Sequence, residues 1–124
     1  MMAAAPEDRQ PPRVTALVVD TDSFEAGYVA SVLTERNVAV LGPFGDVETA
    51  LAAIVDTPPQ TAILGRQQSL ESRGRLVAAL AERGIPYLSL LQSAVVPPAL
   101  RNHAVLAKPF AGYQVAEWVR KNGG

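Results

Sequence analysis

The residues of this sequence that could do chemistry are carboxylates and a lysine at the ends of apolar runs. Asp20 and Asp22 follow the run VTALVV, and Lys108 follows the run AVLA. Carboxylate oxygens are the ligands that Mg²⁺ prefers, and a carboxylate can attack a phosphoryl group. A third run, TAIL, ends in Gly65, which has no side chain to react with. The ends of these runs therefore carry an acid and a lysine, and the position between them has no reactive side chain.

Elements with two different hydrophobic periods must position these residues. Continuous apolar runs are typical of strands buried on both faces, and apolar residues three or four apart are typical of amphipathic helices. The expected strands cover 14–20, 38–42, 61–65, 85–91 and 104–108. The expected helices cover 22–36, a segment that starts after Asp46, 69–83 and 111–122, with at most a short helix in 95–102.

This alternation of strand and helix predicts an α/β domain with a parallel sheet. Five strands in a chain of this size fit a flavodoxin-like, three-layer sandwich with the strand order 2-1-3-4-5. In such sheets the functional crevice lies at the carboxyl ends of the strands, near strands 1 and 3. Asp20, Gly65 and Lys108 would meet at that edge.

Helical faces and caps can also be predicted. Asp22 is expected to cap the first helix, with Glu25 as its reciprocal partner three residues later. Phe24, Tyr28 and Val32 form one stripe of that helix, with Val29 and Leu33 beside it. The apolar side chains expected to face inward from the second helix are Val47, Ala50, Leu51, Ile54 and Val55.

Length, composition and charge exclude several classes of function. A chain of 124 residues without Cys fits one domain, and it cannot have disulfides or thiolate metal sites. A net charge of −1 and one His predict no nucleic-acid surface and no histidine cage. No apolar run is long enough for a membrane span and the start does not resemble a signal peptide, so we expect a cytoplasmic protein. We expect a disordered lead in 1–12, one domain in 13–122 and no output domain.

The order and spacing of several motifs resemble the receiver (CheY-like) domains of two-component response regulators. The motifs are LVVDTD, GPF followed by VETALA, RGIPYLSL, and LAKPF, and the resemblance covers roughly 13–122. It implies a phosphorelay setting. Active receivers carry an acidic pair for Mg²⁺, a phosphoacceptor aspartate, a Ser/Thr after strand 4, an aromatic residue on strand 5 and a lysine before proline.

The resemblance implies a degenerate phosphorylation pocket. Its positions in this chain are Asp20, Thr21, Asp22, Gly65, Leu91, Val105 and Lys108. Asp20 matches the first acid of the pair, Thr21 replaces the second, and Gly65 replaces the phosphoacceptor. Leu91 and Val105 replace the Ser/Thr and the aromatic residue. We therefore expect no phosphorylation, no specific metal and no cofactor, with Lys108–Pro109 in the cis form.

Alternatives stay open at several positions. Asp20 and Lys108 are expected to form a structural ion pair, although they could together bind an anion. Gly65 could mark a pocket no longer in use, or leave room for a ligand or for close backbone approach. Trp118 lies at the rim of the last helix, as a core edge or as a contact anchor.

Two hypotheses of function follow, and catalysis is not one of them. The first is a stand-alone pseudo-receiver that acts by phosphorylation-independent protein contact, with a face around Trp118, Gln114 and Val105. Its partner would be a sensor histidine kinase, a phosphotransfer protein or another receiver. The second is a small-molecule sensor that uses the vacated pocket of Gly65, Leu91 and Thr21. The sequence does not fix the oligomeric state.

Overall fold

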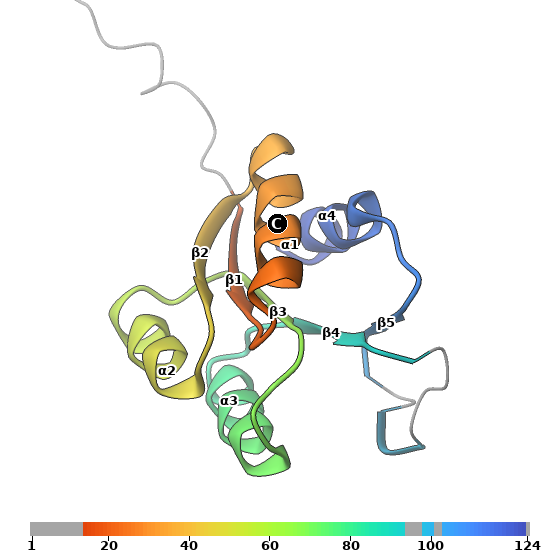
Figure 1. Cartoon of the computed structure of the whole chain (residues 1–124). Coiled ribbons are helices and arrows are strands. Elements are labelled where there is room, and N and C mark those ends of the chain that lie inside the picture. Colours follow the sequence, from red (N-terminus) through yellow and green to blue (C-terminus); the bar gives the residue numbers. More distant parts are fainter. Residues whose placement is uncertain (1–13, 94–97, 101–102, 124) are drawn as a thin grey trace, which may run out of the picture.

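Five parallel strands form one sheet in the computed structural model, which describes residues 14–93, 98–100 and 103–123 (Figure 1). The strands are β1 (Thr15–Val19), β2 (Ala39–Phe44), β3 (Thr61–Leu64), β4 (Tyr87–Leu91) and β5 (Val105–Ala107). Their order is β2-β1-β3-β4-β5, and every neighbouring pair is parallel. The predicted strand order is therefore confirmed.

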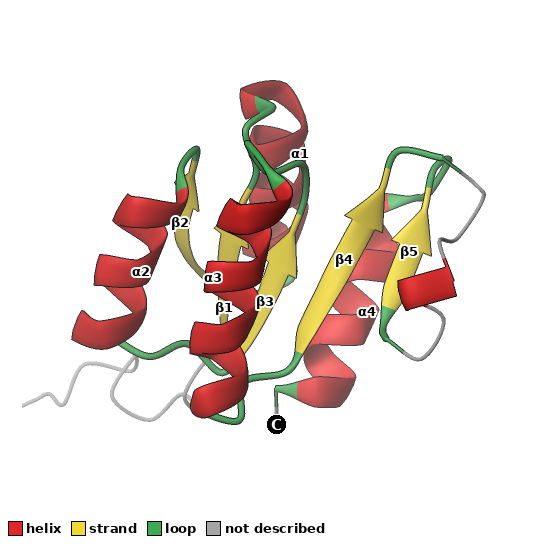
Figure 2. Cartoon of the chain, turned by 90° about the horizontal axis from the view of Figure 1, so that it is seen from below, coloured by secondary structure: helices red, strands yellow, loops and turns green. Residues whose placement is uncertain are grey.

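Four helices cover the two faces of the sheet, and Figure 2 shows the resulting three layers. The helices are α1 (Ser23–Glu35), α2 (Val47–Asp56), α3 (Leu70–Glu82) and α4 (Gly112–Asn122). One core lies between the sheet and α1 with α4, and the other lies between the sheet and α2 with α3. Because side chains alternate along a strand, Ala16 and Val18 of β1 enter the first core while Leu17 and Val19 enter the second. This flavodoxin-like sandwich confirms the predicted fold class.

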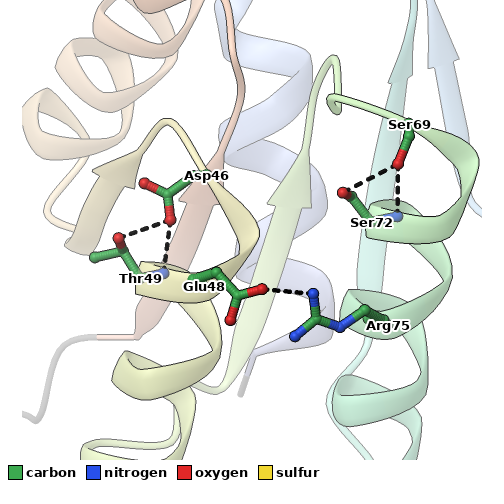
Figure 3. Close-up of polar contacts among 6 residues, drawn as sticks. All are labelled: Asp46, Glu48, Thr49, Ser69, Ser72 and Arg75. Carbon is green, nitrogen blue, oxygen red and sulfur yellow. Dashed lines mark hydrogen bonds and ion pairs between the residues drawn. The ribbon is translucent and has the colours of Figure 1, made fainter.

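Polar side chains fix the starts of the helices at the carboxyl edge of the sheet. Asp46 caps α2 as predicted, since its Oδ1 accepts bonds from the backbone N–H and the hydroxyl of Thr49 (Figure 3). Ser69 caps α3 by accepting from the backbone N–H of Ser72. These bonds satisfy N–H groups that have no partner within the helix.

An ion pair joins two of the helices, and a glutamine side chain binds the backbone at the start of a third. Arg75 on α3 forms an ion pair with Glu48 on α2, so that the two neighbouring helices are joined on their outer side (Figure 3). At the start of α4, Gln114 Oε1 accepts a bond of 2.7 Å from the backbone N–H of Ala111.

The predicted faces of two helices are confirmed in part, because most of their apolar residues pack in the cores but three do not. Phe24 and Tyr28 on α1 are exposed, at 91% and 49%, while Ala26, Val29 and Leu33 are buried. Val55 on α2 is also exposed rather than facing inward. The buried stripe of α1 is therefore displaced by one residue from the aromatic stripe that the sequence emphasised.

In the described part of the connection from β4 to β5, Pro98–Leu100 form a short turn of 3-10 helix. The remainder of the expected short helix, at 95–97 and 101–102, lies outside the described residues, as does the expected lead in 1–12. Lys108–Pro109 is cis, as predicted, and Gly42–Pro43 is also cis. Among the helices of the described segments, none has the length and hydropathy to span a membrane.

Candidate functional site

Asp20 lies at the carboxyl end of β1 and is 2% exposed. Its Oδ1 accepts bonds from the backbone N–H groups of Asp22, at 2.8 Å, and Arg66, at 3.2 Å. Because one N–H comes from the start of α1 and the other from the end of β3, the carboxyl group joins the two central strands. These bonds fix the direction of the side chain across the edge of the sheet.

Gly65 directly follows β3 and lies against this carboxyl group. Its backbone N–H donates to the carbonyl of Val19 over 2.8 Å, which continues the pairing of β1 and β3. A Cβ atom at position 65 would overlap the Asp20 carboxylate and would lie 2.9 Å from the Asp20 Cβ. The space that a side chain at position 65 would occupy is therefore filled by Asp20.

Lys108 forms its ion pair with Glu25 and not with Asp20. The Lys108 ammonium lies 2.9 Å from Oε1 of Glu25, so the expected Asp20–Lys108 ion pair is wrong. The Glu25 side chain is 7% exposed, whereas that of Lys108 is 41% exposed. Glu25 is also not the reciprocal capping partner of Asp22, because its carboxylate points toward Lys108 and Asp20. Asp22 itself caps α1 as predicted, through the N–H groups of Phe24 and Glu25.

Of the two buried carboxyl groups, Asp20 keeps its proton to a higher pH than Glu25. Burial, together with the hydrogen bond to Glu25 and the negative charge of Glu25, raises the pKa of Asp20 to about 7. Burial acts to raise the pKa of Glu25 too, but its bond with Asp20 and the Lys108 ammonium outweigh burial and hold that pKa below its usual range. The proton on Asp20 supplies a donor between two carboxyl groups whose Asp20 Oδ2 and Glu25 Oε2 have no other hydrogen bond within the described part of the chain, whereas Glu25 Oε1 is paired with Lys108.

The replaced positions of the predicted pocket lie around this pair without joining it. Thr21 is exposed, and its backbone N–H donates to the carbonyl of Arg66 over 2.8 Å. Leu91 is half-buried at the end of β4, where its carbonyl accepts a bond from the backbone N–H of Lys108. The Arg66 guanidinium donates to Gln92 Oε1 over 3.1 Å, which bridges the ends of β3 and β4.

The residues at this edge do not fit a magnesium ion. Mg²⁺ needs several oxygen ligands in near-octahedral order. Of the two Asp20 oxygens, Oδ1 accepts two backbone bonds, and Oδ2 lies over Gly65 beside Glu25. Within residues 14–93, 98–100 and 103–123, no group of three or more acidic or histidine side chains is placed to hold a metal ion.

The predicted interaction residues do not share one face. Trp118 is half-buried and packs against the core between α1, α4 and the sheet, as a core edge would. Gln114 is exposed at the start of α4. Val105 pairs with Ser89 of β4, whereas its neighbour Leu106 enters the core that Trp118 covers. By the alternation of strand side chains, Val105 points to the opposite face of the sheet from Trp118.

Sequence reasoning missed Glu25 as a member of the site. A signal was available, because Glu25, Val29 and Leu33 are each four residues apart and so lie on one stripe of α1. A carboxylate on a buried stripe needs a partner, and the lysine at the same edge is the nearest candidate. No comparable signal exists for the Arg66–Gln92 bond, which depends on how two loops approach each other.

Solved structures with a similar backbone are receiver domains. The signal receiver domain of the response regulator NarL from Mycobacterium tuberculosis has a TM-score of 0.71 and 26% identity, and the match covers 90% of this chain and 96% of that one. The chemotaxis protein CheY4 of Vibrio cholerae has a TM-score of 0.73 and 18% identity, covering 90% and 99%.

One longer structure also matches. NtrX from Brucella abortus has a TM-score of 0.74 and 20% identity over 90% of this chain, which spans 26% of the length of that protein. No family model and no curated protein sequence matches the chain. On the strand order, the position of the site and these structural neighbours, the chain has the CheY-like flavodoxin fold of response-regulator receiver domains.

Proposed function

We propose that this chain is a pseudo-receiver, a signalling module that acts through protein contacts without accepting a phosphoryl group. One observation carries the proposal: the Asp20 carboxyl group occupies the space in which a phosphoacceptor side chain at position 65 would stand. An aspartate introduced there would meet two other carboxyl groups in a buried site that contains one lysine. Phosphoryl transfer in receivers needs a free carboxylate and a metal, and the occupied space at Gly65 together with the two backbone bonds to Asp20 Oδ1 argues against both here.

The side chains that would respond to a phosphoryl group in a receiver are also replaced at positions 91 and 105. As the family is understood, phosphate draws a Ser/Thr on strand 4 inward and an aromatic residue on strand 5 follows. Leu91 has no hydroxyl to make that bond, and Val105 has no ring to move. A switch needs two arrangements of similar free energy and something that biases them. We infer that the signalling surface is held in one state.

The partner we propose is a protein of the same signalling systems, namely a sensor histidine kinase, a phosphotransfer protein or another receiver. The solved receiver domains support this class, because they share the fold over nine-tenths of this chain. We place the contact on the outer side of α4, where Gln114 is exposed and the edge of Trp118 remains accessible. The setting we propose is cytoplasmic, and no enzymatic role is proposed.

The crowding at Gly65 counts against the second hypothesis, a sensor that uses the pocket of Gly65, Leu91 and Thr21. The Asp20 carboxyl group fills the space directly above Gly65, and it is held there by two backbone N–H groups. Any ligand would first have to displace a buried, hydrogen-bonded side chain. Protein contact is therefore the better supported of the two functions.

The experiment that tests the proposal compares partner binding with and without a phosphodonor. The tagged chain is used to isolate its partner from cells that produce it, and the affinity of the purified pair is measured by calorimetry. We expect the same affinity before and after treatment with acetyl phosphate and Mg²⁺. An affinity that changes severalfold with the phosphodonor, through a modification of this chain, would overturn the proposal.

A further inference from the structure

A hollow of about 780 Å³ lies beside the buried acids, between the start of α1 and the segment that follows β5. Sites for small molecules usually have volumes of roughly 300–1,000 Å³ and mostly apolar walls with few polar groups. Three aromatic rings, Phe24, Tyr28 and Phe110, line this hollow together with Pro109. Its size and its walls are those of a small-molecule site.

The aromatic walls are open to solvent and at least one is fixed in position. Phe24 is 91% exposed and Tyr28 is 49% exposed. The Tyr28 hydroxyl accepts a bond of 2.9 Å from the backbone N–H of Gly112, so that α4 holds the ring in place. Exposed rings that converge on one hollow leave apolar area in contact with water, which binding a ligand would remove.

The charges of the hollow favour a cation. Its lining contains two carboxylates, Asp22 and Glu25, and one ammonium group, Lys108, for a net charge of −1. The faces of aromatic rings carry partial negative charge and attract organic cations within about 6 Å. Both features disfavour an anionic ligand and favour a positively charged one.

The contact between Glu25 and Lys108 shows that Glu25 pairs with an ammonium group. Its ammonium lies 2.9 Å from Glu25 Oε1, and its side chain is 41% exposed, so the buried acid is reached from the solvent side by a flexible amine. An ammonium group on a ligand could take the same place if the lysine swung outward. A carboxylate has about four lone-pair sites, which leaves Glu25 capacity beyond its contacts with Lys108 and Asp20.

We propose that this hollow binds a small organic cation, an ammonium group on an apolar or aromatic body. The body lies against Phe24, Tyr28 and Phe110, and the ammonium group pairs with Glu25 in place of Lys108. This site is adjacent to the receiver edge but does not use the space over Gly65. It is independent of whether the chain accepts a phosphoryl group.

The buried proton makes the binding depend on pH. The charged side chains near Asp20 and Glu25 are Asp22 at the start of α1 and Lys108 after β5, while the Arg66 guanidinium after β3 donates to Gln92 and acts electrostatically on Lys108. Because the pKa of Asp20 is raised to about 7, the site gains a negative charge as the pH rises through neutrality. A cation should therefore bind more tightly on the alkaline side of pH 7, and should release the proton of Asp20 as it binds.

Three probes with the same aromatic body test the charge preference. Phenethylamine carries an ammonium, phenethyl alcohol is neutral and phenylacetate is an anion. Each is titrated into the labelled full chain, and backbone amide shifts are followed by NMR. We expect saturable shifts in the first turn of α1 and around Lys108–Phe110, with affinity in the order amine, alcohol, acid. Equal affinities, a preference for the acid or an absence of saturation would overturn the proposal.

Two variants test the roles of the side chains. Phe24→Ala should weaken phenethylamine binding about fivefold, since an exposed cation–π contact contributes roughly that factor. The matched control is Leu70→Ala on α3, another exposed apolar side chain, 89% exposed and not part of the hollow, which should leave the affinity unchanged. An equal effect of both variants would contradict the assignment of the hollow.

A third variant separates the proposal from a merely structural role of the ion pair. Lys108→Met removes the competing ammonium and should tighten phenethylamine binding, whereas a structural role alone would leave it unchanged or weaker. Circular dichroism before the titration identifies a folded sample. If Lys108→Met does not fold, Lys108→Arg serves as the second variant, and its tighter bidentate grip on Glu25 should weaken the amine. An unchanged affinity in the folded variant would overturn the exchange.

Discussion

The substitution Gly65→Ala should destabilise this protein, although it adds a single methyl group. A Cβ atom at position 65 would overlap the Asp20 carboxyl group. That group cannot move aside freely, because its Oδ1 accepts the backbone N–H groups of Asp22 and Arg66. Either the methyl group shifts the end of β3, or Asp20 gives up bonds that satisfy two N–H groups.

The expected loss follows from the cost of overpacking. An extra methyl group in a well-packed interior costs about 1–3 kcal/mol of unfolding free energy. We expect Gly65→Ala to lie toward the upper end, because both neighbouring segments are fixed by sheet hydrogen bonds. Gly65→Asp should cost more, since it places a third carboxyl group beside Asp20 and Glu25.

Urea unfolding followed by circular dichroism measures the effect, with a glycine in open surroundings as the control. Gly74 lies in α3 and a Cβ there would meet nothing within 4 Å, so Gly74→Ala should stabilise the protein by about 0.5–1 kcal/mol. In the Asp20→Ala background the cost of Gly65→Ala should shrink, because the overlapping group is gone. A Gly65→Ala protein as stable as wild type, or an equal cost in both backgrounds, would refute the reasoning.

Three further predictions concern the same edge and its surroundings. The pKa of Asp20 is raised above its unfolded value, so its contribution to stability is complete in acid and is lost as the pH rises toward about 7. Between roughly pH 5 and 7 the unfolding free energy should therefore fall by up to about 1.4 kcal/mol per pH unit. Asp20→Asn should flatten this slope in urea titrations. Asp22→Ala should cost about 1 kcal/mol by thermal or urea unfolding, because it removes the cap of α1, and an unchanged stability would exclude the cap. Trp118→Ala should weaken binding of the co-purified partner while the variant stays folded by circular dichroism, and full affinity would remove the outer side of α4 from the contact.

The fold could be predicted because its signals are local and mutually consistent. Continuous apolar runs, helical spacings and caps such as Asp22 and Asp46 each identify one element without knowledge of the others. Their alternation then leaves few possible topologies. The error in the face of α1 concerns its aromatic residues: Phe24 and Tyr28 are exposed, whereas Val29 and Leu33, predicted beside them, are buried.

The site could be predicted only in outline. The sequence located Asp20, Gly65 and Lys108 at one edge, because the carboxyl ends of parallel strands converge. It did not predict that Glu25 lies between the acid and the lysine, since that depends on the rotation of α1 over the sheet. It also left two alternatives for Gly65, and only the position of the Asp20 side chain distinguishes an unused pocket from a filled one.

Intact-mass spectrometry after treatment with a phosphodonor tests the central claim most directly. The wild-type chain is incubated with acetyl phosphate and Mg²⁺, beside a receiver domain that retains its phosphoacceptor aspartate as the positive control. Because the Asp20 carboxyl group fills the space that a side chain at position 65 would need, and its Oδ1 accepts two backbone bonds, we predict an unchanged mass for this chain and an adduct for the control. A stoichiometric, base-labile phosphoryl adduct on this chain would contradict the account.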